Sequence, residues 1–194
     1  MTSGPWLIAG LGNPGAKYER TRHNAGFWFV ERLARRNHLE LKPEKKMLGR
    51  AVRGRVEGVE ALLLAPDTFM NNSGQSLRAA TDFYRIPVDR VLVVYDELDL
   101  PPGTVRFKLG GGHGGHNGLR SIFSHLGTPE FWRLRIGIGH PGLPQAVTPW
   151  VLGRANAGDE VAIVDAIDRG LDVLKEFLAG REGEAMKVLH AKPR

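Results

Sequence analysis

Residues that can move a proton or bind a carbonyl oxygen are concentrated in a few short polar segments of the sequence. The most reactive of them are His23 and Asp96, and side-chain amides stand at Asn13, Asn71 and Asn117. Each such residue alone is more often a turn or helix-cap residue than a functional one. As a set they favour a site that activates water. A histidine removes the proton, a carboxylate orients the ring, and amides bind a substrate or an oxyanion.

The first glycine motif raises a different possibility. Residues 10–15 read GLGNPG, the G-x-G-x-x-G spelling of a dinucleotide-binding turn, which is typical of nicotinamide- or flavin-dependent proteins. In that fold the third glycine lies inside a helix, and an acidic residue ends the second strand. Here Pro14 breaks the chain, and Glu31, the acid nearest the right distance, falls within a predicted helix. We interpret the segment as a tight turn that points Asn13 outward, with an oxidoreductase as the alternative.

Other kinds of catalytic site are disfavoured. The chain has no cysteine, which removes disulfides, thiolate nucleophiles and Cys-based zinc sites. His113 and His116 have H-x-x-H spacing, but they lie on a glycine-rich loop, and no carboxylate stands at helical spacing to complete a zinc site. The G-x-S-x-G motif of serine hydrolases does not occur. We therefore expect neither a metal ion nor an organic cofactor.

These polar segments follow predicted strands. Apolar or alternating runs indicate strands, and apolar residues three or four positions apart indicate helices. The expected strands are residues 7–11, 50–56, 60–65, 91–95, 104–109 and 134–138, and the expected helices are residues 24–36, 73–84, 117–126 and 159–178. We expect Ser73 and Asn117 to act as helix caps, and residues 141–149 to form a loop.

The alternation of strands and helices predicts an α/β fold. We expect one globular domain over residues 1–194, with a twisted mixed β-sheet surrounded by helices. The C-terminal helix, residues 159–180, would be a mobile flank. In α/β sheets, sites form where loops leave the strand ends, so the polar segments are expected to converge there.

The charge of the chain bears on its partners. The 194 residues include 27 Lys and Arg against 21 Asp and Glu, a net charge of +6, and basic residues cluster between residues 42 and 55. This surplus favours a polyanionic partner such as nucleic acid, although many soluble proteins are mildly basic. No apolar run is long enough to span a membrane, and residues 1–12 do not resemble an export signal. A cytoplasmic protein is expected.

Several longer motifs resemble the bacterial peptidyl-tRNA hydrolase family. They occur in the family's order and comprise GLGNPG with the following Tyr18, TRHN, TFMNNSG, DELDLPPG, KLGGGHGGHNGLRS and RLRIGIGHPG, which begin at residues 10, 21, 68, 96, 108 and 133. The resemblance covers residues 7 to about 152. It implies an enzyme that hydrolyses the ester between a peptide and the ribose of tRNA, with a single α/β domain that is monomeric and free of metal.

The resemblance also implies roles for individual residues. His23 would be the general base, and Asp96 would hold its ring and stabilise the imidazolium. Asn71 would stabilise the oxyanion, while Asn13 and Asn117 would hold the peptide backbone and the water. The remaining expected substrate contacts are Tyr18, Met70, Leu98 and His116, and the expected tRNA phosphate contacts are Lys108 and Arg135.

The chain departs from the family pattern at two places. Tyr95 stands where relatives often have histidine before Asp96, and Pro66-Asp67 replaces a common lead into the TFMN segment. Neither change removes a proposed catalytic group, but Tyr95 could alter the pKa of its neighbours. A non-catalytic RNA-binding protein with the same basic surface is the second alternative.

Overall fold

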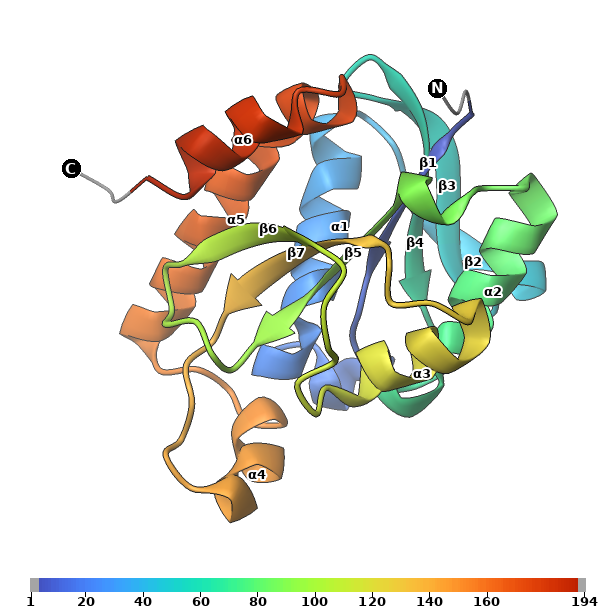
Figure 1. The fold of residues 1–194 in the computed structure, drawn as a ribbon. Coiled ribbons are helices and arrows are strands. Elements are labelled where there is room, and N and C mark those ends of the chain that lie inside the picture. Colours follow the sequence, from blue (N-terminus) through green and yellow to red (C-terminus); the bar gives the residue numbers. More distant parts are fainter. Residues whose placement is uncertain (1–3, 192–194) are drawn as a thin grey trace.

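The apolar runs of the sequence form the centre of one mixed sheet. The computed structural model describes residues 4–191. The strands of this part of the chain form a seven-stranded sheet in the order β2-β3-β4-β1-β5-β7-β6 (Figure 1). They are β1 (Trp6–Gly10), β2 (Lys42–Glu44), β3 (Gly49–Val56), β4 (Val59–Pro66), β5 (Val91–Glu97), β6 (Val105–Leu109) and β7 (Trp132–Gly137). The predicted mixed sheet is confirmed.

The four central strands are parallel and the outer ones are antiparallel. β4, β1, β5 and β7 run in one direction, whereas β2, β3 and β6 pair antiparallel with their neighbours. Parallel strands are covered on both faces, so their sequences are apolar throughout. Accordingly, every residue of β1 is buried, as are residues 61–66 of β4.

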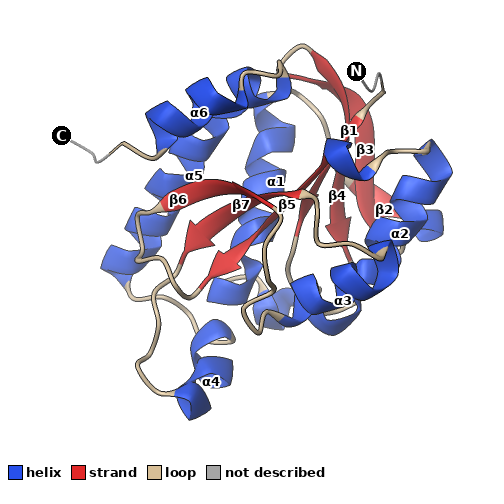
Figure 2. Ribbon diagram, in the orientation of Figure 1, coloured by secondary structure: helices blue, strands red, loops and turns tan. Residues whose placement is uncertain are grey.

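Helices cover the two faces of the sheet (Figure 2). One hydrophobic cluster joins the sheet to α1 (Ala25–Arg36), α5 (Ala157–Leu178) and α6 (Glu182–Leu189). A second cluster on the opposite face joins it to α2 (Ser73–Tyr84) and α3 (Asn117–Leu126). The short helix α4 (Val147–Val151) extends below the sheet in the view of Figure 1, and its Val151 packs into the first cluster.

The long helix α5 follows from its sequence. Asn156 is the N-cap and accepts a 2.8 Å hydrogen bond from the backbone N–H of Asp159, and Asp159 and Glu160 supply negative charge in the first turn. Its apolar residues pack into the core, and Asp168 forms an ion pair with Arg32 of α1 at 3.1 Å. The helix was expected from residue 159 and begins at Ala157. Its mobility stays a prediction.

Some local expectations were wrong. Strand β2 and helices α4 and α6 were not predicted, because they are short or polar and carry little periodic signal. The N-cap of α2 is Asn72 rather than Ser73, whose hydroxyl donates instead to the Met70 carbonyl at 2.8 Å. The N-cap of α3 is His116 rather than Asn117. Residues 141–149, expected to be a loop, include the start of α4.

The first glycine motif serves close packing. A Cβ on Gly10 would lie 2.1 Å from the carbonyl oxygen of Gly26, and a Cβ on Gly26 would lie 2.4 Å from the Leu11 nitrogen. The two glycines therefore let the start of α1 approach the end of β1. Gly15 is followed by a short 3-10 turn at Ala16–Tyr18, and α1 begins only at Ala25. No helix N-terminus stands directly behind the motif to receive a pyrophosphate.

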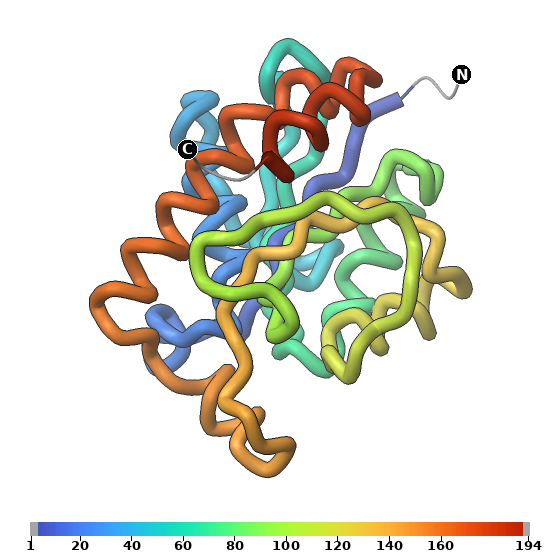
Figure 3. The backbone as a smooth tube through the Cα atoms, turned by 60° about the vertical axis from the view of Figure 1, so that its left-hand side comes forward, coloured from blue at the N-terminus to red at the C-terminus, as the bar shows by residue number. Residues whose placement is uncertain are grey.

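Two routes bring polar segments to one edge of the sheet. Because β1, β4 and β5 are parallel, the residues after them meet at the same edge, as expected. Strand β6 is antiparallel to β7, so its last residue, Leu109, lies opposite Trp132 at the far edge. The glycine-rich loop (residues 110–116) that follows must return along the sheet before α3 begins (Figure 3). Its convergence with the other polar segments was expected, but this return route was not predicted.

Candidate active site

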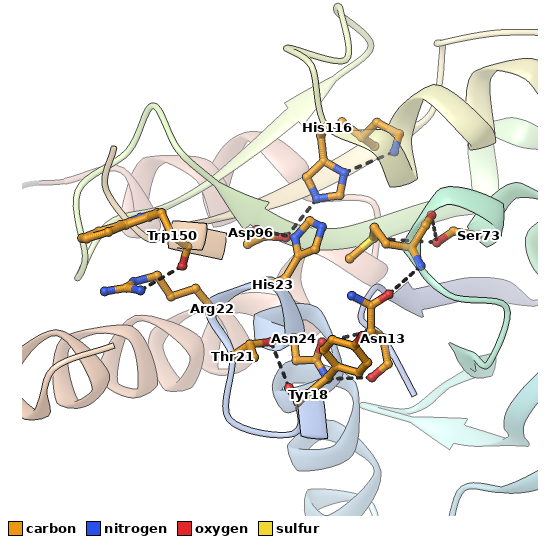
Figure 4. Close-up of polar contacts among 12 residues, drawn as sticks. Asn13, Tyr18, Thr21, Arg22, His23, Asn24, Ser73, Asp96, His116 and Trp150 are labelled. Atoms are coloured by element: carbon orange, nitrogen blue, oxygen red, sulfur yellow. Dashed lines mark hydrogen bonds and ion pairs between the residues drawn. The ribbon is translucent and has the colours of Figure 1, made fainter. Parts of the chain in front are cut away.

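The histidine and carboxylate expected to act together are in direct contact. His23 lies in a 3-10 turn (Arg22–Asn24) that precedes α1, and Asp96 lies near the end of β5. His23 Nδ1 is 2.8 Å from Asp96 Oδ2 (Figure 4). The His23 side chain is 10% exposed and the Asp96 side chain 1% exposed. The close packing of Gly10 against Gly26 places the turn beside β5.

A second imidazole binds the same carboxylate. His116 Nε2 lies 2.9 Å from Asp96 Oδ1, and its Nδ1 accepts the backbone N–H of Leu119 at 3.3 Å. Both ring nitrogens of His116 are therefore engaged. Its nitrogens face Asp96 and the first turn of α3, and the expected contact of His116 with substrate stays a prediction. His116 orients the carboxylate in this structure.

The contacts define how these groups are protonated. Burial alone would raise the pKa of Asp96, but the charges and hydrogen bonds of His23 and His116 outweigh it and lower that pKa. Burial alone would lower the pKa of His23, and the charge and hydrogen bond of Asp96 raise it above its usual value. Because an ionised carboxylate only accepts, His23 donates from Nδ1. Its Nε2 remains to accept a proton from water.

Asn13 is held rigidly beside this pair. Its backbone N–H donates to Asn24 Oδ1 at 2.8 Å, and Asn24 Nδ2 donates to the Asn13 carbonyl at 2.9 Å. The Asn13 Oδ1 accepts the Met70 backbone N–H at 2.7 Å. These bonds fix the side chain so that its amide NH₂ is the group left for a ligand (Figure 4). Asn24 was not singled out from the sequence, so this function was missed.

The other expected substrate contacts, Tyr18, Met70 and Leu98, are aromatic or apolar. Met70 is 3% exposed. The preceding Phe69 is 53% exposed and has a positive φ of 58°, which is unusual for a bulky residue. Its ring meets Tyr18 edge-on with centroids 6.3 Å apart. Leu98 is half-buried against the cluster on the α1 and α5 face.

The three amides line two different cavities. Asn71 and Asn117 are both exposed and share a cavity of about 390 Å³ that runs along α3 from Asn117 to His125. Asn13 lines a larger cavity of about 600 Å³ that extends under the loop after β1 and along α1. The predicted amides therefore lie in two neighbouring hollows rather than in one pocket.

The predicted tRNA contacts lie on an open face of the sheet. Arg135 of β7 is partly buried and pairs with Glu97 at 3.5 Å, and Lys108 of β6 is exposed. Arg106, which was not predicted, lies directly opposite Arg135 in the antiparallel register. Residues 105 and 107 point into the core, so the alternation of β6 could have placed residues 106 and 108 together on the other face.

The same site contains the one candidate metal cluster among residues 4–191. Ligand atoms of His23, Asp96 and His116 lie within 4.8 Å of one another. Their hydrogen bonds account for this closeness, because each imidazole nitrogen that faces the carboxylate carries a proton. A metal ion would have to displace both protons.

Comparison with known proteins identifies the family. A family model described as peptidyl-tRNA hydrolase matches residues 7–194. The chain belongs to this family. The peptidyl-tRNA hydrolase of Acidithiobacillus ferrooxidans is 53% identical over 186 residues, 96% of this chain and 98% of that protein. That of Pseudomonas syringae pv. syringae is 52% identical over 187 residues, 96% of each chain.

Solved structures of the peptidyl-tRNA hydrolase family share the fold. The crystal structure of the enzyme from Acinetobacter baumannii has a TM-score of 0.95 at 48% identity, and the match covers 98% of this chain and 97% of that chain. A complex of a peptidyl-tRNA hydrolase with N-propanol has a TM-score of 0.94 at 48% identity, again covering 98% of this chain and 97% of that one. The hydrolase interpretation of the sequence is confirmed over the RNA-binding and oxidoreductase alternatives.

Proposed function

We propose that this chain cleaves the ester between a peptide and the ribose of tRNA, with His23 as the general base. His23 is assigned as the base because its Nδ1 lies 2.8 Å from Asp96 Oδ2. This contact leaves the other ring nitrogen, Nε2, as the one that can accept a proton from water. Membership of the peptidyl-tRNA hydrolase family supplies the substrate class.

The reaction needs one base and no covalent intermediate. His23 Nε2 takes a proton from water, and the oxygen of that water attacks the ester carbonyl. Asp96 stabilises the imidazolium that forms. When the tetrahedral intermediate collapses, the ribose oxygen leaves and takes the proton back from His23. A ribose hydroxyl is a better leaving group than an amine, so activated water suffices.

The amides are proposed to hold the reacting groups. Asn71 would donate to the oxyanion, a contribution of about 10²–10³-fold for such a donor. The free NH₂ of Asn13 and the amide of Asn117 would bind the peptide backbone and the attacking water. Side-chain amides that read backbone groups accept almost any peptide sequence. Tyr18, Met70, Leu98 and His116 remain proposed contacts of the substrate.

Selection for peptidyl over aminoacyl substrates would depend on the α-nitrogen. In peptidyl-tRNA this nitrogen is an uncharged amide, whereas in aminoacyl-tRNA it is an ammonium group. An amide side chain that binds the acylated group leaves the ammonium poorly solvated and incorrectly paired. We propose that this difference protects aminoacyl-tRNA from cleavage.

The tRNA would lie against the open face of β6 and β7. Lys108 and Arg135 are the proposed phosphate ligands, and Arg106 is added to them by the register of the strands. Two arginines directly opposite each other on a strand pair repel unless an anion lies between them. Glu97 offsets only part of this charge.

Further proposals concern the setting of the enzyme. We propose that it acts in the cytoplasm as a monomer without a metal or other cofactor, and that residues 1–194 form one domain, of which residues 1–3 and 192–194 lie outside the described part. Within residues 4–191 no helix is long and apolar enough to cross a membrane.

The decisive experiment is hydrolysis of N-acyl-aminoacyl-tRNA by the variant His23→Ala. Loss of the base should lower kcat by about 10²–10⁴-fold, while tRNA binding persists because the phosphate contacts are elsewhere. The matched control is His38→Asn, because His38 is exposed and has a positive φ of 56° that asparagine tolerates.

Two results would contradict the proposal. Unchanged hydrolysis by a folded His23→Ala variant would show that His23 is not the general base. Equal rates on acylated and non-acylated aminoacyl-tRNA would show that the α-nitrogen does not select the substrate.

A further inference from the structure

A buried arginine holds the start of the glycine-rich loop. Arg133 lies in β7 and is 1% exposed. Its guanidinium donates to the carbonyls of Gly112 at 2.5 Å and of Gly111 at 2.7 Å, and also to that of Pro129 at 3.1 Å. Burial of a cation is costly unless hydrogen bonds compensate for the lost water. Here backbone carbonyls provide the compensation, and in return their positions are fixed.

The same guanidinium fixes the loop relative to α3. It lies 5.0 Å from the centroid of Phe123, a residue of α3, and 4.9 Å from that of Phe131. Cations over aromatic faces are held more firmly when they are shielded from water, as Arg133 is. Arg133 therefore joins the loop, the helix after it and the strand β7 at one point.

The C-terminal half of the loop is held by its own hydrogen bonds, from the Gly115 N–H to His113 Nδ1 and from the His116 N–H to the His113 carbonyl, but its glycines hold the first half less firmly. Gly111, Gly114 and Gly115 have φ values of 101°, 58° and 81°, and glycine has the greatest backbone freedom to lose on folding. A Cβ added to Gly112 or Gly114 would have no neighbour within 4 Å, so little packs against the loop there. The carbonyl contacts of Arg133 thus restrain residues 111 and 112, from which the chain continues toward His116.

This path ends at the catalytic pair. In the sheet Asp96 is opposite Ile136, three residues along β7 from Arg133, which corresponds to about 10 Å. The loop covers this distance and places His116 on Asp96. The ring of Tyr95 packs against His116 with centroids 5.0 Å apart, and its hydroxyl is an electrostatic neighbour of Arg133.

We propose that Arg133 is a positioning residue for hydrolysis. By fixing the carbonyls of Gly111 and Gly112 and by backing Tyr95, it holds His116 against Asp96 Oδ1. The other carboxylate oxygen, Oδ2, is then held within hydrogen-bonding distance of His23 Nδ1. The inference rests on the proposed role of His23 as the base. It also gives a function to Tyr95, one of the two places at which the chain departs from its family pattern.

The test replaces Arg133 by methionine, which keeps an unbranched stem between the rings but removes every donor. We expect kcat for N-acyl-aminoacyl-tRNA to fall by about 10–100-fold, because small displacements of catalytic groups have effects of this size. KM should change much less, because the basic face of β6 and β7 is intact. Imidazole ¹⁵N NMR should show that His116 has lost its single tautomer, and amide exchange at residues 111–116 should accelerate.

Matched variants separate positioning from general stability. Arg169→Met is the control, because Arg169 of α5 also donates to a glycine carbonyl, that of Gly103, at a distance from the glycine-rich loop. It should leave kcat and the His116 signals unchanged. Arg133→Lys keeps the charge but lacks the planar fork, so it should give an intermediate kcat.

The proposal is overturned if folded Arg133→Met has wild-type kcat and an unaltered His116 spectrum. If that variant does not fold, Arg133→Lys decides: accelerated exchange of residues 111–116 together with a wild-type kcat would refute the link. The NMR signals of His116 do not depend on turnover. A failure of His23 as the base would therefore appear in the hydrolysis of His23→Ala and leave this readout intact.

Discussion

At the scale of single residues, the pKa of His23 sets the pH range in which it can accept a proton. Asp96 raises this pKa above the usual value for histidine, and the protonated ring cannot act as a base. We expect kcat/KM to fall as the pH decreases through the raised pKa, so the acidic limb should lie above about pH 6.5.

Asp96→Asn tests the cause of this shift. The amide removes the negative charge, so burial is left to lower the pKa of His23 and the acidic limb should move to lower pH. The plateau should also fall, because the imidazolium loses its stabilising partner and the ring its fixed tautomer. A pH–rate profile of both proteins measures the two effects. An acidic limb that stays in place in the variant would contradict the assigned cause.

At the scale of elements, the approach of α1 to β1 places His23 beside Asp96. Gly10→Ala would put a Cβ 2.1 Å from the Gly26 carbonyl oxygen, and that contact involves backbone, which cannot move aside easily. We expect a loss of about 1–3 kcal/mol in the free energy of unfolding, measured by urea denaturation. Hydrolysis should also fall, because the turn that carries His23 is displaced.

Gly183→Ala is the matched control for this substitution. Gly183 lies in α6, and a Cβ there would have no neighbour within 4 Å. Alanine is the better helix former, so stability should stay the same or rise by up to about 1 kcal/mol. If Gly10→Ala were as stable as this control, the glycine motif would not serve close packing.

At the scale of the whole molecule, three basic side chains of β6 and β7 share one face of the sheet. Arg106, Lys108 and Arg135 share the side of β6 and β7 that lies opposite α5. Binding of tRNA should weaken steeply with salt, since each phosphate contact releases counterions. Arg106→Gln should lower the slope of log K against log salt by about one. The slope is measured by titrating tRNA at several salt concentrations.

A second arginine variant controls for the loss of charge alone. Arg36→Gln removes the same charge from α1, on the opposite face of the sheet, where Arg36 pairs with Asp172 at 2.8 Å. Its salt slope should equal that of the wild type. Equal slopes for Arg106→Gln and the wild type would show that the tRNA does not contact residue 106.

Local patterns in the sequence determined the elements and the candidate groups. The apolar runs of β1, β4 and β5 and the periodicity of α5 are properties of neighbouring residues, so they can be read without a fold. The resemblance of the motifs to a family then supplied the pairing of His23 with Asp96. Short elements such as β2 and α6 were missed because a few polar residues carry no period.

Tertiary structure decided how these groups contact one another. That His116 shares Asp96 with His23 depends on the antiparallel direction of β6 and on the return of the glycine-rich loop. That Arg133 is buried could not be predicted, because arginine is almost always exposed unless partners compensate for its burial. Two of its partners are carbonyls more than 20 positions distant in sequence, and backbone groups are chemically alike in every sequence. Only the folded chain shows which of them the guanidinium meets.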